Sequence, residues 1–399
     1  MGVPAGTFAA EVWSRRPLLT PAADSGADFT DLLSLAAVDE LLSRRGLRTP
    51  FIRMAKQGTV IPAREYTRSG GQGAGVADQV ADDQVLRLVA DGATLVLQGL
   101  HRLWPPLIEF GGRLTAELGH PVQINAYLTP PLNQGFAPHY DTHDVFVLQV
   151  AGPKRWVIHP PVLVDPLPGQ DWEKHRDAVT ERAATQPLLD VVLQPGDALY
   201  LPRGFVHSAM AQGETSLHLT VGVHPVTRYR LLQQLLAEAA DEPSLRASLP
   251  VDPAIGGAEP ALESWLAGPL ADTVAAFTTF AEGPRLPGVA ARLADELAGA
   301  TRPAPIEPLA QLAALQALGP ESTFRLRAGL RVRLDRSGAG IRLRALGTTL
   351  DLAPATEPAL KPVLAGEPVC ARGLPGLAGP EALELVRSLV TAAVLVPVD

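Results

Sequence analysis

Cysteine and long apolar runs are scarce in this sequence, and each scarcity excludes a class of protein. The 399 residues include one cysteine, Cys370, so no disulfide can form within the chain. No run of about 18 apolar residues is present to span a membrane. Residues 1–13 also lack the apolar centre of a secretory signal. We therefore expect a cytoplasmic protein with no membrane partner.

Positive charge is also in short supply. The chain holds 34 lysines and arginines against 42 aspartates and glutamates, which gives a net charge of −8. A protein with this balance is not a general binder of polyanions, so we do not expect nucleic acid as a partner. Hydrophobic residues make up 46% of the chain and charged residues 19%, as in a globular protein with a large core. A chain of this length predicts two or three domains.

A candidate metal site is present in the middle of the chain. His139 and Asp141 lie in a segment that we predict to be a β-strand, where residues two apart share a face. His207 follows at the end of a second predicted strand, which begins after the turn at residues 195–197. Two imidazoles and one carboxylate form the facial ligand set of non-haem Fe(II) oxygenases, which leaves three metal positions open. His143 has the same parity, but we expect it to turn away.

Short strands separated by glycine and proline turns dominate residues 122–226. This pattern predicts a jelly-roll barrel of the cupin type. Helical patterns precede it, including one over residues 28–46 that Asp28 or Thr30 could cap and Gly46 could end. Further helical patterns follow the barrel, and residues 300–308 form a proline-rich linker. The sequence therefore predicts a β-rich domain flanked by helices.

The residues between Asn125 and His224, together with the segment EVWSRRPLL near the N-terminus, resemble the JmjC-type cupin oxygenases. Among these the chain is most similar to the bacterial ribosomal oxygenases, which hydroxylate ribosomal proteins with Fe(II), O2 and 2-oxoglutarate. The resemblance implies a mainly β catalytic domain of the double-stranded β-helix type over residues 1–225. It also implies a helical, dimerisation-like module over 226–305 and a winged-helix-like α+β domain over 306–399.

The resemblance also implies which residues bind the cosubstrate. Lys154 lies where JmjC relatives place a cation that binds the distal carboxylate of 2-oxoglutarate, although a surface ion pair is the alternative. Arg155 should point to the opposite face of the same strand. Asn125 and Tyr127 match positions that contact the cosubstrate in ribosomal oxygenases, but they could instead be polar groups paired within the barrel.

One position departs from the family pattern. Relatives often carry a hydroxyl donor where this chain has Gly222, so Thr220 or a water molecule would have to replace it. The residues at 216, 218, 220 and 222 form a polar face that should look into the barrel. We expect no catalytic residue beyond the metal centre.

The function implied is hydroxylation of a protein side chain, with histidine or arginine of a ribosomal protein favoured. The alternatives are a hydroxylase of a peptide or carrier-bound amino acid in biosynthesis, and a non-catalytic metal-binding cupin scaffold. Helices between residues 228 and 300 could form a homodimer or pack on their own barrel. The arginine-rich hairpin over 324–346 alternates charged and apolar residues, which indicates a solvated outer face or a nucleic-acid contact.

Overall fold

The computed structural model describes residues 2–251, 259–337 and 340–398. By its internal contacts the chain separates into two units, Met1–Pro225 and Val226–Asp399. The first unit covers the range predicted for the catalytic domain. The second holds both the predicted helical module and the predicted winged-helix-like domain, and the division between those two stays a prediction. No helix within the described ranges is long and apolar enough to cross a membrane.

Helices surround the barrel of the first unit. The helix predicted near residues 28–46 is shorter than expected, because α3 (Leu35–Arg44) begins after Ser34, whose hydroxyl accepts from the N–H of Ala37 at 3.1 Å. The prediction that Asp28 or Thr30 would cap it was wrong. The Asp28 carboxylate instead accepts the backbone and hydroxyl hydrogens of Thr30 in a local turn, both at 2.9 Å. The other helices here are α1 (Ala5–Thr7), α2 (Ala22–Ser25), α4 (Asp82–Ala90), α5 (Pro105–Leu118) and α6 (Arg176–Ala183).

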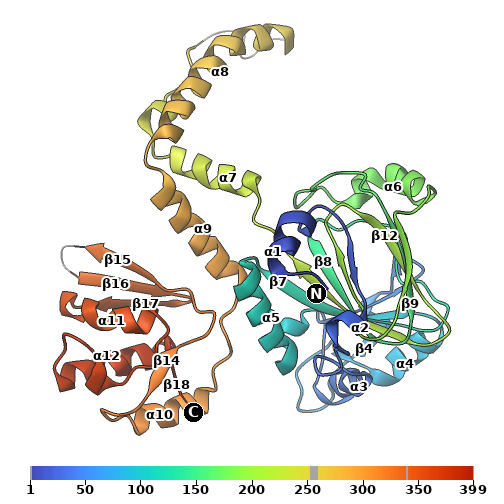
Figure 1. Ribbon diagram of the computed structural model, residues 1–399, viewed down its shortest axis with the longest axis horizontal. Coiled ribbons are helices and arrows are strands. Elements are labelled where there is room, and N and C mark those ends of the chain that lie inside the picture. Colours follow the sequence, from blue (N-terminus) through green and yellow to red (C-terminus); the bar gives the residue numbers. More distant parts are fainter. Residues whose placement is uncertain (1, 252–258, 338–339, 399) are drawn as a thin grey trace. The chain divides into compact units, whose positions relative to one another are not determined.

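Two antiparallel sheets form the barrel, and Figure 1 shows β7 and β8 across from β9 and β12. The large sheet contains, in spatial order, β1 (Leu18–Thr20), β11 (Ala198–Leu201), β8 (Asp144–Ala151), β13 (Ser216–Val223), β7 (Val122–Thr129), β6 (Thr94–Leu97), β2 (Ile52–Lys56) and β3 (Thr59–Val60). The small sheet contains β10 (Leu189–Leu193), β9 (Lys154–His159) and β12 (Val206–Ala211). A short pair, β4 (Thr67–Arg68) and β5 (Gln79–Val80), lies apart from them.

Side-chain alternation explains why the sheets face each other. Val145 and Val147 of β8 share a buried cluster with Trp156 and Ile158 of β9, which places this face of β8 between the sheets. Phe146 and the other residues of opposite parity on β8 belong to a second cluster that includes the N-terminal helices. The two sheets thus enclose an apolar interior, and the predicted β-rich barrel is confirmed.

The strand assignment around the metal motif was wrong in two places. His139 forms an isolated bridge with His207, and Asp141 lies in a loop before β8. The strand predicted to end at His207 is two strands, because Pro202 lacks an N–H and Gly204 has a φ of +85°, which together interrupt the ladder. His207 is therefore the second residue of β12.

The second unit begins with three helices, α7 (Arg228–Ala239), α8 (Glu259–Glu282) and α9 (Leu286–Ala300). Ion pairs join α7 to α9, with Arg230 on Glu296 and Arg292 on Glu238, each at 2.7 Å. A separate apolar cluster follows. It is built from α10 (Pro308–Gln316), β14 (Phe324–Leu326), β15 (Arg333–Ser337), β16 (Gly340–Ala345), β17 (Thr348–Leu352), α11 (Glu357–Leu364), α12 (Gly379–Thr391) and β18 (Leu395–Pro397).

The prediction of a hairpin over 324–346 was wrong in its first part, because β14 pairs with β18 and, within the described part of this range, only β15 and β16 form a hairpin, in a three-stranded sheet with β17. The turn of this hairpin at residues 338–339 lies outside the described residues. Arg333 and Arg344 both contact Asp335 at 2.8 Å, and Arg342 contacts Asp351 at 2.7 Å. Arginines that already pair with carboxylates offer less positive charge to a phosphate backbone. These contacts favour the solvated outer face over a nucleic-acid surface.

We predict that Gly204→Ala destabilises the first unit more than an ordinary glycine substitution does. A Cβ at Gly204 would overlap the carbonyl oxygen of Leu163, in addition to requiring a left-handed backbone. Gly213 also has a positive φ, of +72°, but a Cβ there would meet nothing within 4 Å. Gly213→Ala should therefore cost about 1–2 kcal/mol in unfolding free energy, and Gly204→Ala about 1–3 kcal/mol more. Equal losses of stability in denaturant unfolding would contradict the close approach.

Candidate metal centre and cosubstrate pocket

Three predicted ligands converge at one point in the barrel. One ligand atom from each of His139, Asp141 and His207 lies within 4.8 Å of the other two. The Nε2 atom of His207 is 3.7 Å from the Asp141 carboxylate, and the two imidazole rings are 4.4 Å apart between centroids. These separations suit three groups that face a common ion rather than one another.

Backbone hydrogen bonds hold the three residues together, although only His207 lies in a strand. His139 and His207 each donate an N–H to the other's carbonyl, at 3.1 and 2.8 Å. The N–H of Gly204 donates to the carbonyl of Asp141 at 3.0 Å. The loop 139–141 is thereby fixed against the start of β12.

The hydrogen bonds of both rings select the tautomer that a metal requires. The Nδ1–H of His139 donates to the carbonyl of Ala137 at 2.8 Å, and that of His207 donates to the carbonyl of Phe205 at 3.0 Å. A nitrogen facing a carbonyl must carry the proton of the neutral ring, which leaves a lone pair on Nε2. Such second partners orient metal-binding histidines and raise their basicity.

Burial also sets the charge state of the ligands. Burial first, and the neighbouring His139 second, lower the pKa of His207 to about 4. Burial alone would raise the pKa of Asp141, but the imidazoles of His143, His207 and His139 outweigh it and the pKa is lowered. The site therefore keeps a neutral imidazole beside an ionised carboxylate, which is the state that binds a divalent metal.

The three ligands lie on the wall of a cavity of about 380 Å³. The same cavity contains Lys154, which is only 3% exposed. Its ammonium donates to the hydroxyl of Thr129 at 3.0 Å and lies 3.4 Å from Nδ1 of His218. Thr94 extends this polar cluster through a 3.3 Å contact with Thr129. Other wall residues include Arg53, Tyr127, Phe136, Trp156, Trp172, Glu173 and Thr220.

Lys154 is a buried basic residue without a carboxylate partner among the described residues. Burial lowers its pKa to about 7. Desolvating an ammonium without a counter-charge is costly, so an anionic group that entered the cavity would be favoured there. Arg155 is exposed and pairs with Asp190 at 2.8 Å, so the two basic residues lie on opposite faces as strand alternation predicted.

The other predicted cosubstrate residues divide into two groups. Tyr127 and Thr220 line the cavity, and the Tyr127 ring stacks on His218 at 5.1 Å. Asn125 is not part of the cavity wall as described; its side-chain oxygen accepts the N–H of Gly99 at 3.0 Å. A Cβ on Gly222 would lie 3.0 Å from the His143 ring. A hydroxyl at position 222 would thus meet His143, which contacts Gln123 at 3.2 Å.

Sequence reasoning missed several wall residues. Thr129 shares the strand parity of Asn125 and Tyr127, and that signal could have identified it. Thr94 comes from a short apolar strand with no motif. Trp172 and Glu173 belong to the charged insert between β9 and β10, where nothing in the sequence indicates proximity to the metal ligands.

Comparisons with known proteins agree with this geometry. The JmjC domain family matches residues 112–231. The bifunctional lysine-specific demethylase and histidyl-hydroxylase NO66 of Culex quinquefasciatus is 31% identical over 252 residues, 61% of this chain and 37% of that protein. Ribosomal oxygenase 1 of Gallus gallus is 31% identical over 253 residues, 61% of this chain and 40% of that protein. The chain thus spans about two fifths of the length of these curated relatives.

Solved structures share the fold over nearly the whole chain. The crystal structure of the Escherichia coli ribosomal oxygenase YcfD aligns with a TM-score of 0.54 at 18% identity, covering 99% of this chain and 98% of that one. A YcfD structure in complex with cobalt and 2-oxoglutarate aligns with a TM-score of 0.51 at 17% identity, with the same coverage. Likeness at these identities shows a common fold.

We predict that His139→Ala or Asp141→Ala removes metal binding and leaves the barrel folded. Each change deletes a ligand that is not part of the apolar core, so the fold should survive. Calorimetric titration with Co(II) should show binding by the wild type and none by either variant, with unchanged circular dichroism. His143→Ala is the matched control and should bind Co(II) normally. Wild-type affinity in either ligand variant would refute the assignment.

Proposed function

We propose that this JmjC-domain protein, which is similar to the ribosomal oxygenases, is an Fe(II)- and 2-oxoglutarate-dependent oxygenase that hydroxylates a protein side chain. His139, Asp141 and His207 would hold the iron. When bound, Fe(II) and 2-oxoglutarate would supply the activation of O2: the keto acid provides two electrons and takes up one oxygen atom as it loses CO2 to give succinate, and the other oxygen atom enters a C–H bond of the substrate. A cytoplasmic location remains a prediction.

One observation carries the proposal, namely that the three ligands and Lys154 share a single cavity. A metal-binding scaffold needs the ligands but not a desolvated cation beside them. A dicarboxylate cosubstrate needs both, because one end can chelate the metal while the other end receives the ammonium of Lys154. Thr129 and Tyr127, on the same wall, would add hydroxyl contacts.

The substrate that we favour is a histidine or arginine of a ribosomal protein. Support comes from the names of the similar proteins, which include ribosomal oxygenase and histidyl-hydroxylase. The test is intact and peptide mass spectrometry of ribosomal proteins from cells with and without the gene. A gain of one oxygen on a histidine or arginine that disappears in the deletion strain supports the proposal.

Two other outcomes of that experiment would change the assignment. An unchanged set of ribosomal proteins, together with 2-oxoglutarate turnover by the purified protein, would favour the peptide or carrier-bound amino acid substrate. An increase in lysine methylation in the deletion strain would point to the demethylase activity that the name of NO66 includes. Absence of any turnover would favour the scaffold.

We further propose that the second unit forms a homodimer through its helices. Tyr229, Leu232 and Leu236 of α7 are each more than half exposed, at 52%, 56% and 63%. Leu270 and Val274 of α8 are exposed to a similar extent, and such apolar surface is commonly covered by a partner. Light scattering of the full chain should give twice the monomer mass. Leu232→Glu combined with Leu236→Glu should give a monomer, and a monomeric wild type would refute the dimer.

We predict that Lys154→Ala weakens 2-oxoglutarate binding without weakening metal binding. A hydrogen bond to a charged group contributes about 1.5–3 kcal/mol, so the dissociation constant should rise roughly ten- to a hundredfold. Titration of the Co(II)-loaded protein measures it. Arg155→Ala is the control, because that side chain lies outside the barrel on Asp190. A larger effect from Arg155→Ala than from Lys154→Ala would place the cosubstrate on the outer face of β9 and contradict the role of Lys154.

We also predict that 2-oxoglutarate affinity falls as pH rises above about 7. The lowered pKa of Lys154, about 7 in the free protein, leaves the amine partly neutral in mild alkali, whereas a bound carboxylate requires the ammonium and raises its pKa. Binding must then take up a proton, so affinity should fall by up to about tenfold per pH unit. Calorimetry in buffers of different ionisation enthalpy measures that uptake. Lys154→Arg, which stays charged, should abolish the dependence; a pH-independent wild type would contradict the role.

A further inference from the structure

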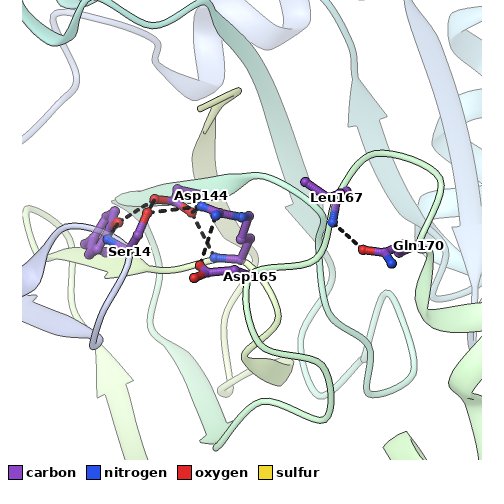
Figure 2. Close-up of polar contacts among 7 residues, drawn as sticks. Ser14, Asp144, Asp165, Leu167 and Gln170 are labelled. Atoms are coloured by element: carbon purple, nitrogen blue, oxygen red, sulfur yellow. Dashed lines mark hydrogen bonds and ion pairs between the residues drawn. The ribbon is translucent and has the colours of Figure 1, made fainter. Parts of the chain in front are cut away.

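Asp144 is a fully buried carboxylate that the proposed chemistry does not use. It begins β8, three residues after the ligand Asp141. Its oxygens accept hydrogen bonds from the Tyr200 hydroxyl at 2.6 Å and the Ser14 hydroxyl at 3.0 Å. They also accept from Arg203, through the backbone N–H at 3.0 Å and the guanidinium at 3.4 Å. Figure 2 shows this group, with Ser14, Asp144 and Asp165 labelled.

The hydrogen bonds around Asp144 all lead toward its carboxylate, which is the final acceptor. The backbone N–H of Ser14 donates to the Tyr200 oxygen at 2.8 Å, and the Arg203 guanidinium donates to the Ser14 hydroxyl at 3.1 Å. The hydroxyls of Tyr200 and Ser14 therefore each accept one hydrogen bond and donate one to Asp144. Burial, followed by the charge of Asp144, raises the pKa of Tyr200, which keeps this proton in place. All the neighbours of Asp144 in the network are donors, so the central group must accept at both of its oxygens. An asparagine there would place its NH2 group against another donor.

The network is joined to the metal ligands through the turn 202–205. The N–H of Arg203 donates to the Asp144 carboxylate, and the N–H of the next residue, Gly204, donates to the carbonyl of Asp141, each at 3.0 Å. Two consecutive donors of one turn thus hold both ends of the segment 141–144. The same turn leads into β12, where His207 is the second residue. Moving Asp144 or Arg203 would shift Asp141 relative to His207.

Stability alone does not account for such a buried pair. Desolvating a carboxylate and a guanidinium costs several kcal/mol per ion, and apolar residues of similar size often serve a fold as well or better. What a directional network adds is a fixed geometry. We propose that Asp144 and Arg203 are positioning residues for the metal ligands, acting through the turn 202–205 and not by contact with the metal. This inference rests on the metal centre of the proposed function.

Arg203 also offers a matched control. Its guanidinium contacts Asp165 at 2.9 Å, but that carboxylate is 52% exposed and belongs to the insert after β9. Asp165→Asn removes an ion pair of the same arginine and leaves in place Asp144 and the backbone hydrogen bonds of the turn. A general effect of losing an Arg203 ion pair would therefore show in both variants, and a positioning effect only in Asp144→Asn.

The test is Co(II) titration of the full-length apoprotein, followed by calorimetry and by the visible spectrum of the bound ion. Asp144→Asn should raise the Co(II) dissociation constant about tenfold or more, the scale seen when groups behind metal ligands are removed. Its Co(II) spectrum should also change, because the spectrum reports ligand geometry and not stability. Asp165→Asn should match the wild type in both readouts. A folded Asp144→Asn protein with wild-type affinity and spectrum would overturn the proposal.

Milder variants keep the proposal testable if Asp144→Asn does not fold. Tyr200→Phe and Ser14→Ala each remove one donor and leave the carboxylate and the turn in place. Both should raise the Co(II) dissociation constant severalfold, and wild-type affinity in both would overturn the proposal. A wild type that bound no Co(II) would refute the metal centre itself, which separates failure of the proposed function from failure of this inference.

Discussion

The site depends on a pair of backbone hydrogen bonds between His139 and His207. They bring two residues from distant parts of the chain to one place. His139 lies in a loop, and His207 lies in β12 just after the irregular turn 202–205. Side chains on the loop could hold an ion here only because the backbone beneath them is held at both ends. The carbonyl partners of the two imidazoles take up Nδ1 and leave Nε2 as the ring nitrogen that would bind an ion.

Two buried residues of opposite charge, Lys154 and Asp144, lie near this centre and have different roles. Lys154 faces the cavity with hydroxyl and imidazole partners, so its charge is balanced when an anion arrives. Asp144 lies behind the ligands and is already satisfied by donors on every side. The first charge suits a ligand that comes and goes. The second suits a framework that must keep its geometry.

The sequence was sufficient to predict the parts that follow a period or a motif. Strand alternation predicted that Lys154 and Arg155 lie on opposite faces, and the family resemblance selected Lys154 as the inner one. The spacing of the histidines and the aspartate predicted the triad. Interruptions of regular structure were harder to predict, because Gly204 splits a predicted strand through its left-handed backbone. Residues that meet only in the folded chain, such as Thr94 and Trp172, carry no signal in a single sequence. Asp144 resembled an ordinary polar residue at the start of a strand, since its partners lie far away along the chain.

We propose above all that the triad and Lys154 form one site that binds Fe(II) and 2-oxoglutarate together. Anaerobic titration of 2-oxoglutarate into the Fe(II)-loaded protein tests it directly, because chelation of the iron by the keto acid produces a visible charge-transfer band. We predict a band that requires both additions, saturates at one equivalent, and is not produced by succinate. Binding of Fe(II) with no such band, at any concentration of 2-oxoglutarate, would contradict the account.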